Sequence, residues 1–203
     1  MKYFLIISFL LITCGSACLR DNLTSSIDKK KTIYIVPLDN VKQTDVALSF
    51  QELKGFYNYD IVILNRDVTP SQYRNPSGKY DAGKILKFLG EKYQHLNGKV
   101  IGITNVNIST KRTLNNVVHN DWSILGFGGI NGQSCVVSTR NMISNHNDRL
   151  SKVTIHEVGH TLGLDHCDND PMCLMNDAKG RASKVDTEKK IMCQNCKNKI
   201  GLE

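Results

Sequence analysis

The amino-acid sequence predicts an α/β (α+β) fold, with a single compact domain built around a mixed, twisted sheet. The chain has 203 residues, which suits one domain with a sizeable core rather than two. Short apolar runs typical of strands alternate with longer segments typical of helices, which indicates neighbouring parallel strands. Asn131-Gly132 lies between the last two apolar runs and predicts a hairpin turn. The hairpin would add an antiparallel edge strand to the sheet.

The predicted strands are short apolar or alternating segments bounded by turn residues. They cover residues 32–37, 60–64, 99–104, 122–126 and 135–139. Two helices are predicted between the first three strands, over residues 44–56 with Thr44 as N-cap, and over residues 81–96 with Asp81 as N-cap and an end at Asn97-Gly98. A further helix is predicted from about Asp148 to Leu164, and Gly163 would close it.

Residues 1–17 are predicted to be a signal peptide rather than part of the fold. Lys2 precedes the apolar run at 4–13, which is too short to span a bilayer. The residues before Cys14 resemble a bacterial lipoprotein signal, so cleavage there would leave a lipidated N-terminal cysteine that attaches the protein to a membrane. Ordinary cleavage after Ala17, near Cys18, is the alternative.

A polar tether at 19–31 would link this segment to the domain at 32–203. We therefore expect an exported protein of the bacterial cell envelope, either periplasmic or anchored as a lipoprotein. The formal net charge is +7, but the lysines are spread along the chain apart from the run at 29–31. This distribution favours a solvated surface, so we expect no nucleic-acid partner.

The residues that carry chemistry gather near the end of the predicted helix. His156 and His160 are four residues apart, so their side chains rise from the same helix face and could bind one metal ion. Gly163 would end the helix in a sharp turn that returns His166 to the same ion. Three imidazoles suit zinc and leave a position open for water. Glu157 would act as general base, taking a proton from the zinc-bound water and passing it to the leaving amine.

The cysteines indicate a second site. Cys167 and Cys173 follow the histidines, and Cys193 and Cys196 form a close pair, which together could make a closed tetrahedral zinc site. Two disulfides among the same four residues are the alternative, which an oxidising exported location would favour. Cys135 is left over within a strand and is expected to be a small buried apolar residue.

The pattern His-Glu-x-x-His-x-x-Gly-x-x-His resembles that of the metzincin zinc peptidases, which have a methionine on a tight turn under the zinc. Met175 is the candidate for that methionine, with a supporting rather than chemical role. His166-Cys167, then Cys173-x-Met175, then seventeen residues and the Cys193/Cys196 pair resemble the archaemetzincins (archaelysins). Five residues separate Cys167 from Cys173, where that family usually has four, and we expect Asp170 or Pro171 to form a one-residue bulge.

The resemblance implies a metzincin-like zinc peptidase, expected to be a monomer, that acts on a peptide or protein. It implies two zinc ions per chain, one catalytic at the three histidines and one structural at the four cysteines. The structural zinc would hold a C-terminal helix, at about 186–199, against the active-site loop. Substrate would lie along an exposed sheet edge, for which the hairpin at 123–139 is the candidate, although it could equally be an ordinary solvent-facing strand.

The alternative function is a non-catalytic, zinc-stabilised binding module. Glu157 argues against it, because a structural metal site has no need of that carboxylate. No residue is assigned as the donor that would stabilise the developing oxyanion.

Overall fold

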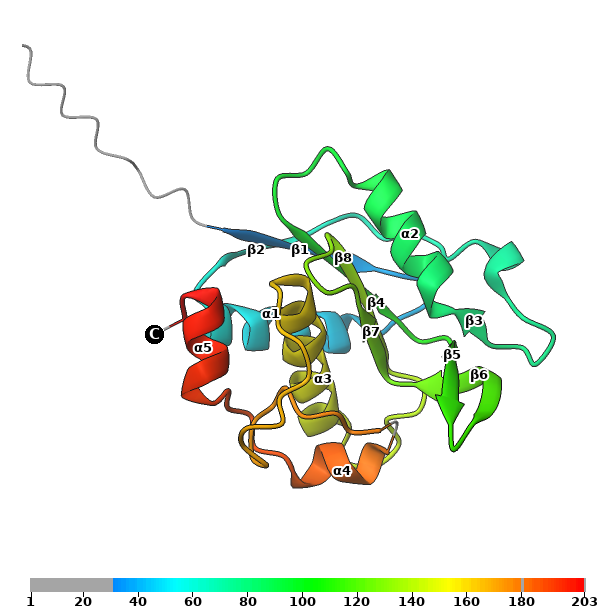
Figure 1. Ribbon diagram of the computed structural model, residues 1–203. Coiled ribbons are helices and arrows are strands. Elements are labelled where there is room, and N and C mark those ends of the chain that lie inside the picture. The colour runs from blue at the N-terminus through cyan, green and yellow to red at the C-terminus, as the bar shows by residue number, and fades with distance from the viewer. Residues whose placement is uncertain (1–30, 180, 203) are drawn as a thin grey trace, which may run out of the picture.

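A five-stranded sheet lies at the centre of the computed structural model, which describes residues 31–179 and 181–202 (Figure 1). Its strands are β1 (Thr32–Pro37), β2 (Asp60–Ile63), β4 (Lys99–Thr104), β7 (Gly126–Gly128) and β8 (Ser134–Ser138), in the order β2-β1-β4-β8-β7. β2, β1, β4 and β8 run parallel to one another, and β7 pairs with β8 in the antiparallel sense. The predicted mixed sheet with an antiparallel edge strand is confirmed.

Helices cover both faces of this sheet (Figure 1), which explains why its central strands are almost continuously apolar. In β1, Ile33 and Ile35 pack in one core with the helices α1 (Gln43–Tyr57) and α3 (His146–Thr161). Val36, on the opposite side of the same strand, packs in a second core with α2 (Ala82–Lys92). The two helices that share a face are also joined directly, since the hydroxyl of Tyr57 donates to the carbonyl oxygen of Ile155 at 2.7 Å.

The predicted helices are present, with shifted ends. Asp81 is the N-cap of α2, and its carboxylate accepts a hydrogen bond from the backbone N–H of Lys84 at 3.1 Å. The predicted end of this helix at Asn97-Gly98 is wrong, because α2 ends at Lys92. Thr44 is not an N-cap, since α1 already begins at Gln43.

A second, three-stranded sheet was not predicted. It consists of β3 (Tyr80–Asp81), β5 (Ile108–Leu114) and β6 (Val117–Ile124), in the order β3-β5-β6. The predicted strand at 122–126 is wrong as a single element, because it covers the end of β6 and the start of β7, which belong to different sheets. Asn131 does lie in the turn between β7 and β8, with φ 55°.

The C-terminal region departs from the expected helix at 186–199. It forms two short helices, α4 (Ala182–Thr187) and α5 (Gln194–Ile200), with non-helical chain between them. In that connection the carbonyl of Ile191 accepts a hydrogen bond from the N–H of Leu174 at 2.7 Å, and the N–H of Cys193 points to the sulfur of Cys173 at 3.3 Å. These bonds to the preceding loop use backbone groups that a continuous helix would need for itself. A 3₁₀ turn, η1 (Ser71–Tyr73), completes the described elements.

The predicted signal peptide, with Cys14 and Cys18, and the tether up to residue 30 lie outside the described residues. Export, lipid attachment and cell-envelope location therefore stay predictions. Within the described part of the chain, none of the helices has the length and apolar character required to cross a membrane.

Candidate active site and cysteine cluster

Helix α3 carries the first two candidate ligands on one face. His156 and His160 are one turn apart, and their Nε2 atoms are 3.0 Å from each other. The helix lies against the sheet through α3–β8 and α3–β7 contacts and buries most of its length, so the two rings stand on a fixed support. A pair of histidines at this spacing on a rigid helix can present two nitrogens to one metal ion.

The turn after α3 brings in the third histidine. Gly163 has φ +103°, a left-handed conformation that glycine adopts readily, and a Cβ there would meet Oδ1 of Asn131 at 2.5 Å. Beyond this turn, the His166 ring centre lies 4.9 Å from that of His160 and 5.5 Å from that of His156. One ring nitrogen from each of the three residues falls within 4.8 Å of the others. The structure thus brings together the three histidines that the spacing singles out.

Backbone carbonyls orient two of the rings. Nδ1–H of His156 donates to the carbonyl oxygen of Leu174 at 2.8 Å, and Nδ1–H of His160 donates to that of Leu164 at 2.7 Å. Because a carbonyl oxygen only accepts, each ring keeps its Nε2 lone pair free for a metal. Burial, with a smaller contribution from His160, lowers the pKa of His156 to about 3, and burial likewise lowers the pKa of His160. Both rings are therefore neutral at physiological pH.

The Glu157 carboxylate lies in a space made by two glycines of β7. A Cβ on Gly126 would meet Cγ and Oε1 of Glu157 at 2.5 Å, and one on Gly128 would meet the backbone oxygen of Glu157 at 2.7 Å. Burial raises the pKa of Glu157 to about 8. The sequence shows this glycine pair as Gly-Phe-Gly-Gly, which lacks any recognised motif, so its role in seating the carboxylate could not be seen beforehand.

Met175 packs directly beneath α3. It is fully buried, and a Cβ on Gly159 would meet its Sδ at 2.7 Å. Its carbonyl oxygen accepts a hydrogen bond from the N–H of Cys167 at 2.8 Å. Met175 thus lies under the helix that carries the first two histidines and beside the residue that follows the third.

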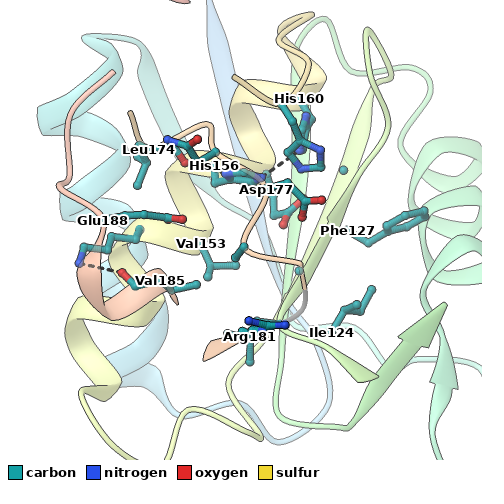
Figure 2. Close-up of a pocket in the computed structure, with 18 of the residues that line it drawn as sticks. Ile124, Phe127, Val153, His156, His160, Leu174, Asp177, Arg181, Val185 and Glu188 are labelled. Atoms are coloured by element: carbon teal, nitrogen blue, oxygen red, sulfur yellow. Dashed lines mark hydrogen bonds between the residues drawn. The ribbon is translucent and has the colours of Figure 1, made fainter. Parts of the chain in front are cut away.

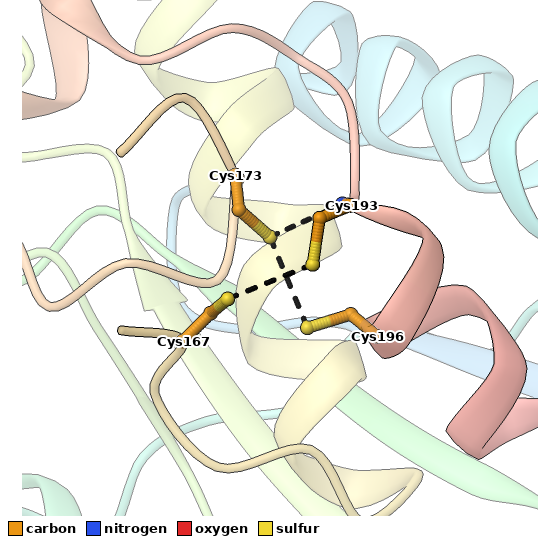
Figure 3. Close-up of side chains that lie close together, drawn as sticks. All are labelled: Cys167, Cys173, Cys193 and Cys196. Atoms are coloured by element: carbon orange, nitrogen blue, oxygen red, sulfur yellow. Dashed lines mark hydrogen bonds between the residues drawn. The ribbon is translucent and has the colours of Figure 1, made fainter. Parts of the chain in front are cut away.

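The four candidate cysteines converge in a second cluster (Figure 3). The sulfurs of Cys167 and Cys193 are 3.6 Å apart, and those of Cys173 and Cys196 are 3.8 Å apart. All four sulfurs lie within 4.8 Å of one another. A disulfide requires about 2.05 Å, so none is formed among these residues. Cys135, the fifth described cysteine, is fully buried in β8, as predicted.

The loop that joins the two clusters is held by side-chain bonds that the sequence did not reveal. The amide of Asn176 donates to the carbonyl oxygens of Asp170 and Cys173, at 2.7 and 2.8 Å. The carboxylate of Asp170 accepts from the N–H of Met172 at 2.8 Å, and the N–H of Cys173 donates to the carbonyl of Asp170 at 3.0 Å. These bonds form a turn before the buried Cys173. The one-residue bulge expected at Asp170 or Pro171 stays a prediction.

A cleft of ≈ 340 Å³ opens over the histidines (Figure 2). Its walls come from β5, β6 and β7 on one side, from α3 below, and from the loop and helix between Asp165 and Glu188 on the other. Glu188 is one lining residue that sequence analysis missed, because it stands in a polar stretch with no motif around it. His146 lies apart from the cleft, at the start of α3, where its Nε2 is 2.9 Å from Oδ1 of Asp45.

Comparison with known proteins shows that this chain is similar to the members of one peptidase family. A family model described as peptidase family M54 matches residues 60–201. The archaemetzincin of Halobacterium salinarum is 29% identical over 183 residues, covering 83% of this chain and 98% of the relative. That of Natronomonas pharaonis is 28% identical over 187 residues, with the same coverage.

Two solved structures are similar in fold. The archaemetzincin from Archaeoglobus fulgidus, complexed with malonate, has a TM-score of 0.69 and 26% identity, covering 83% of this chain and 99% of that one. The archaemetzincin from Methanopyrus kandleri has a TM-score of 0.69, at 21% identity, covering 87% of this chain and 97% of that one.

Proposed function

This chain belongs to peptidase family M54, the archaemetzincins, and is a zinc metallopeptidase; on that premise we propose that it hydrolyses peptide bonds at the three-histidine site, with Glu157 as general base. The observation that carries the proposal is the convergence of three imidazole nitrogens, beside a buried carboxylate, in the floor of one cleft.

The three histidines fit a catalytic zinc ion. Zinc–nitrogen bonds of roughly 2.0–2.1 Å in a tetrahedral arrangement separate two ligand nitrogens by about 3.3 Å. The Nε2 atoms of His156 and His160 are 3.0 Å apart. With one ring nitrogen of His166 included, the three nitrogens lie within 4.8 Å of one another. The neutral rings and their bonds from Nδ1 to carbonyl oxygens are those of metal-ligating histidines. We propose His156, His160 and His166 as the ligands.

A zinc ion, when bound, supplies Lewis acidity that makes water a stronger acid and polarises the carbonyl of the cleaved bond. Glu157 supplies the proton transfers. Its carboxylate accepts a proton from the attacking water and then donates it to the nitrogen of the departing amine. Burial raises the pKa of Glu157 above its ordinary value of 4.5, which makes its carboxylate a stronger base than an exposed one. The glycines of β7 fix where that carboxylate stands.

The four cysteines fit a structural zinc ion. Zinc–sulfur bonds of about 2.3 Å in a tetrahedron separate the sulfurs by about 3.8 Å, and two of the sulfur pairs here are at 3.6 and 3.8 Å. We therefore propose Cys167, Cys173, Cys193 and Cys196 as its ligands, with two zinc ions per chain. This ion would hold α5 to the loop that carries His166. Met175 would support both sites from below.

We propose that the substrate binds as an extended chain beside β7. This strand lies at the end of the sheet order, and all three of its residues line the cleft. Backbone groups of an edge strand can hydrogen-bond a peptide of any sequence. Of the hairpin at 123–139 that was predicted as the binding edge, we propose only β7, since β8 is enclosed between β7 and β4.

The experiment combines metal analysis with cleavage of a peptide mixture by the purified, zinc-loaded chain. We expect close to two zinc ions per chain, and cut sites that mass spectrometry can map. Glu157→Gln should keep both ions and lose at least about a hundredfold in kcat/KM, because it cannot carry the proton. Glu91→Gln, at an exposed site on α2, is the matched control and should behave as wild type.

Unchanged turnover in Glu157→Gln would reject the general base. Full zinc loading without cleavage of any peptide would instead favour the non-catalytic, zinc-stabilised binding module.

A further inference from the structure

Glu188 places a buried carboxylate in the wall of the cleft. The residue is 6% exposed, directly after α4, and Figure 2 shows its carboxylate pointing inward from the side of the cleft away from Phe127. Among the described residues, its Oε1 has no hydrogen-bond partner. A buried carboxylate oxygen without a partner is costly, so folded proteins rarely keep one unless something else binds there.

Lys152, which also lines the cleft, already has two partners. It lies on α3 and is 5% exposed, and its Nζ is 2.7 Å from the carboxylate of Asp148 and donates to the carbonyl oxygen of Val185 at 3.0 Å. Its charge lowers the pKa of Glu188 only partly. Burial has the larger effect, and the pKa of Glu188 is raised to about 7. The other charged groups that act on Glu188 are Lys184, on α4, and Asp177, in the loop.

Besides Lys152, the side chains that line the cleft near Glu188 are largely apolar. Val153 stands one turn before His156 on α3, and Leu174 and Val185 complete the wall around the carboxylate (Figure 2). Such a lining suits a straight hydrocarbon stem and gains free energy from its burial. An unpartnered carboxylate oxygen beside such a lining suits a donor at the end of that stem.

We propose, on the basis of the peptidase function proposed above, that this part of the cleft is a specificity pocket for a basic side chain of the substrate. A lysine or arginine beside the cleaved bond would pass its methylene groups between Val153, Leu174 and Val185. Its charged end would then donate to Glu188, which is the specificity-determining residue.

The chemistry selects against neutral side chains of the same shape. A norleucine side chain fills the apolar stem as lysine does, but it carries no donor and leaves Glu188 without a partner. Sites built to bond a polar group discriminate strongly against analogues that lack it, because the buried partner is left unpaired. Lysine should therefore be preferred to norleucine by at least about tenfold in kcat/KM.

The first test compares peptides that differ only in lysine or norleucine at one position, after cut-site mapping has located the cleaved bond. The zinc-loaded wild-type chain should prefer lysine at a single position next to that bond. Glu188→Gln should reduce the preference for lysine over norleucine to below about twofold. Glu91→Gln is the control, and thermal melting checks that each variant is folded. Equal turnover of the two peptides by wild type would overturn the proposal, whatever the variants do.

The second test does not depend on hydrolysis. Isothermal titration calorimetry measures binding of the same two peptides to Glu157→Gln and to the double variant Glu157→Gln/Glu188→Gln. We expect at least about tenfold tighter binding of the lysine peptide to the first and similar binding of both peptides to the second. Equal affinities for Glu157→Gln, or no binding of the lysine peptide, would overturn the pocket. A lysine preference in binding without any cleavage would keep the pocket and reject the peptidase function.

Discussion

At the scale of single residues, the site depends on glycines, which have no side chain, as well as on the residues that carry the chemistry. Gly126, Gly159 and Gly163 each leave room for a functional neighbour: the carboxylate of Glu157, the sulfur of Met175 and the side chain of Asn131. In each case a Cβ would come within 2.5 to 2.7 Å of that neighbour. The chemistry of the site therefore relies on close approach of backbone to side chain.

Gly126→Ala should impair catalysis without removing the metal. Its Cβ would meet Cγ and Oε1 of Glu157 at 2.5 Å and displace the carboxylate, and a shift of about 1 Å can cost on the order of a hundredfold in rate. Steady-state kinetics and zinc analysis measure the two effects. Gly129→Ala is the matched control, because the nearest atom to its Cβ is at 3.6 Å. Equal activity of the two variants would show that a Cβ at position 126 does not displace the carboxylate of Glu157.

Glu188 makes a prediction about stability and pH. Its pKa is about 7 in the folded chain and about 4.5 when unfolded, so the folded state holds its proton over that interval while the unfolded state releases it. Stability is therefore lost as pH rises from about 4.5 through 7. The free energy of unfolding of Glu188→Gln, relative to that of wild type, should increase by on the order of 2 kcal/mol when the pH is raised from 5 to 8. Urea unfolding at both pH values measures this, and a pH-independent difference would contradict it.

At the scale of elements, the histidine helix could be predicted and the C-terminal helices could not. The four-residue spacing of His156 and His160, followed by Gly163, specifies a helix and its end through local rules alone. The break between α4 and α5 depends on bonds from Leu174 and Cys193 to residues distant in sequence. No local pattern in 186–199 contains that information.

The same reasoning explains the strands. β1 and β4 are enclosed on both faces and were predicted from their apolar residues, whereas β5 is largely polar and partly exposed and was missed. β7 has three residues, two of them glycine, so the strand propensities of its residues do not predict it. Its position becomes clear only from the carboxylate that it accommodates.

Cys193→Ser should remove one zinc ion and loosen α5. That helix has seven residues, too few to be stable alone; Cys193 is its N-cap and Cys196 lies in its first turn. Zinc content should fall by about one per chain, and the melting temperature should fall by several degrees. Cys135→Ala is the control for zinc content, because that thiol is buried in β8, away from the cluster. An unchanged zinc content would contradict the four-cysteine site.

At the scale of the whole molecule, the first half of the described chain supplies three strands of the central sheet, and the second half supplies the cleft, whose lining residues all lie between Thr110 and Glu188. β1 pairs with β2 on one side and β4 on the other, and the later segments supply every candidate metal ligand. The fold class and the two clusters followed from the sequence. The shape of the cleft did not, because it depends on how β6, β7 and the loop before α4 meet.

A chain that begins at Lys31 should fold and cleave peptides as the full chain does, because all described strands lie beyond it. A chain that begins at Asp39 should fail to fold, since the sheet would lose a strand that is paired on both sides. Circular dichroism, thermal melting and kcat/KM distinguish these outcomes. Cooperative melting of the shorter chain would show that β1 is dispensable. The expected monomer, and the absence of nucleic-acid binding, can be measured on the same samples.

The brevity of β7 has a consequence for self-assembly. A long, flat, apolar strand at the border of a sheet recruits identical molecules and can seed fibrils. Here that border consists of three residues, Gly126–Gly128, which give too few successive backbone bonds to template another copy of the sheet. At β7, the molecule can thus offer a short guest a row of hydrogen-bonding groups on a strand that is too short to pair stably with another copy of itself.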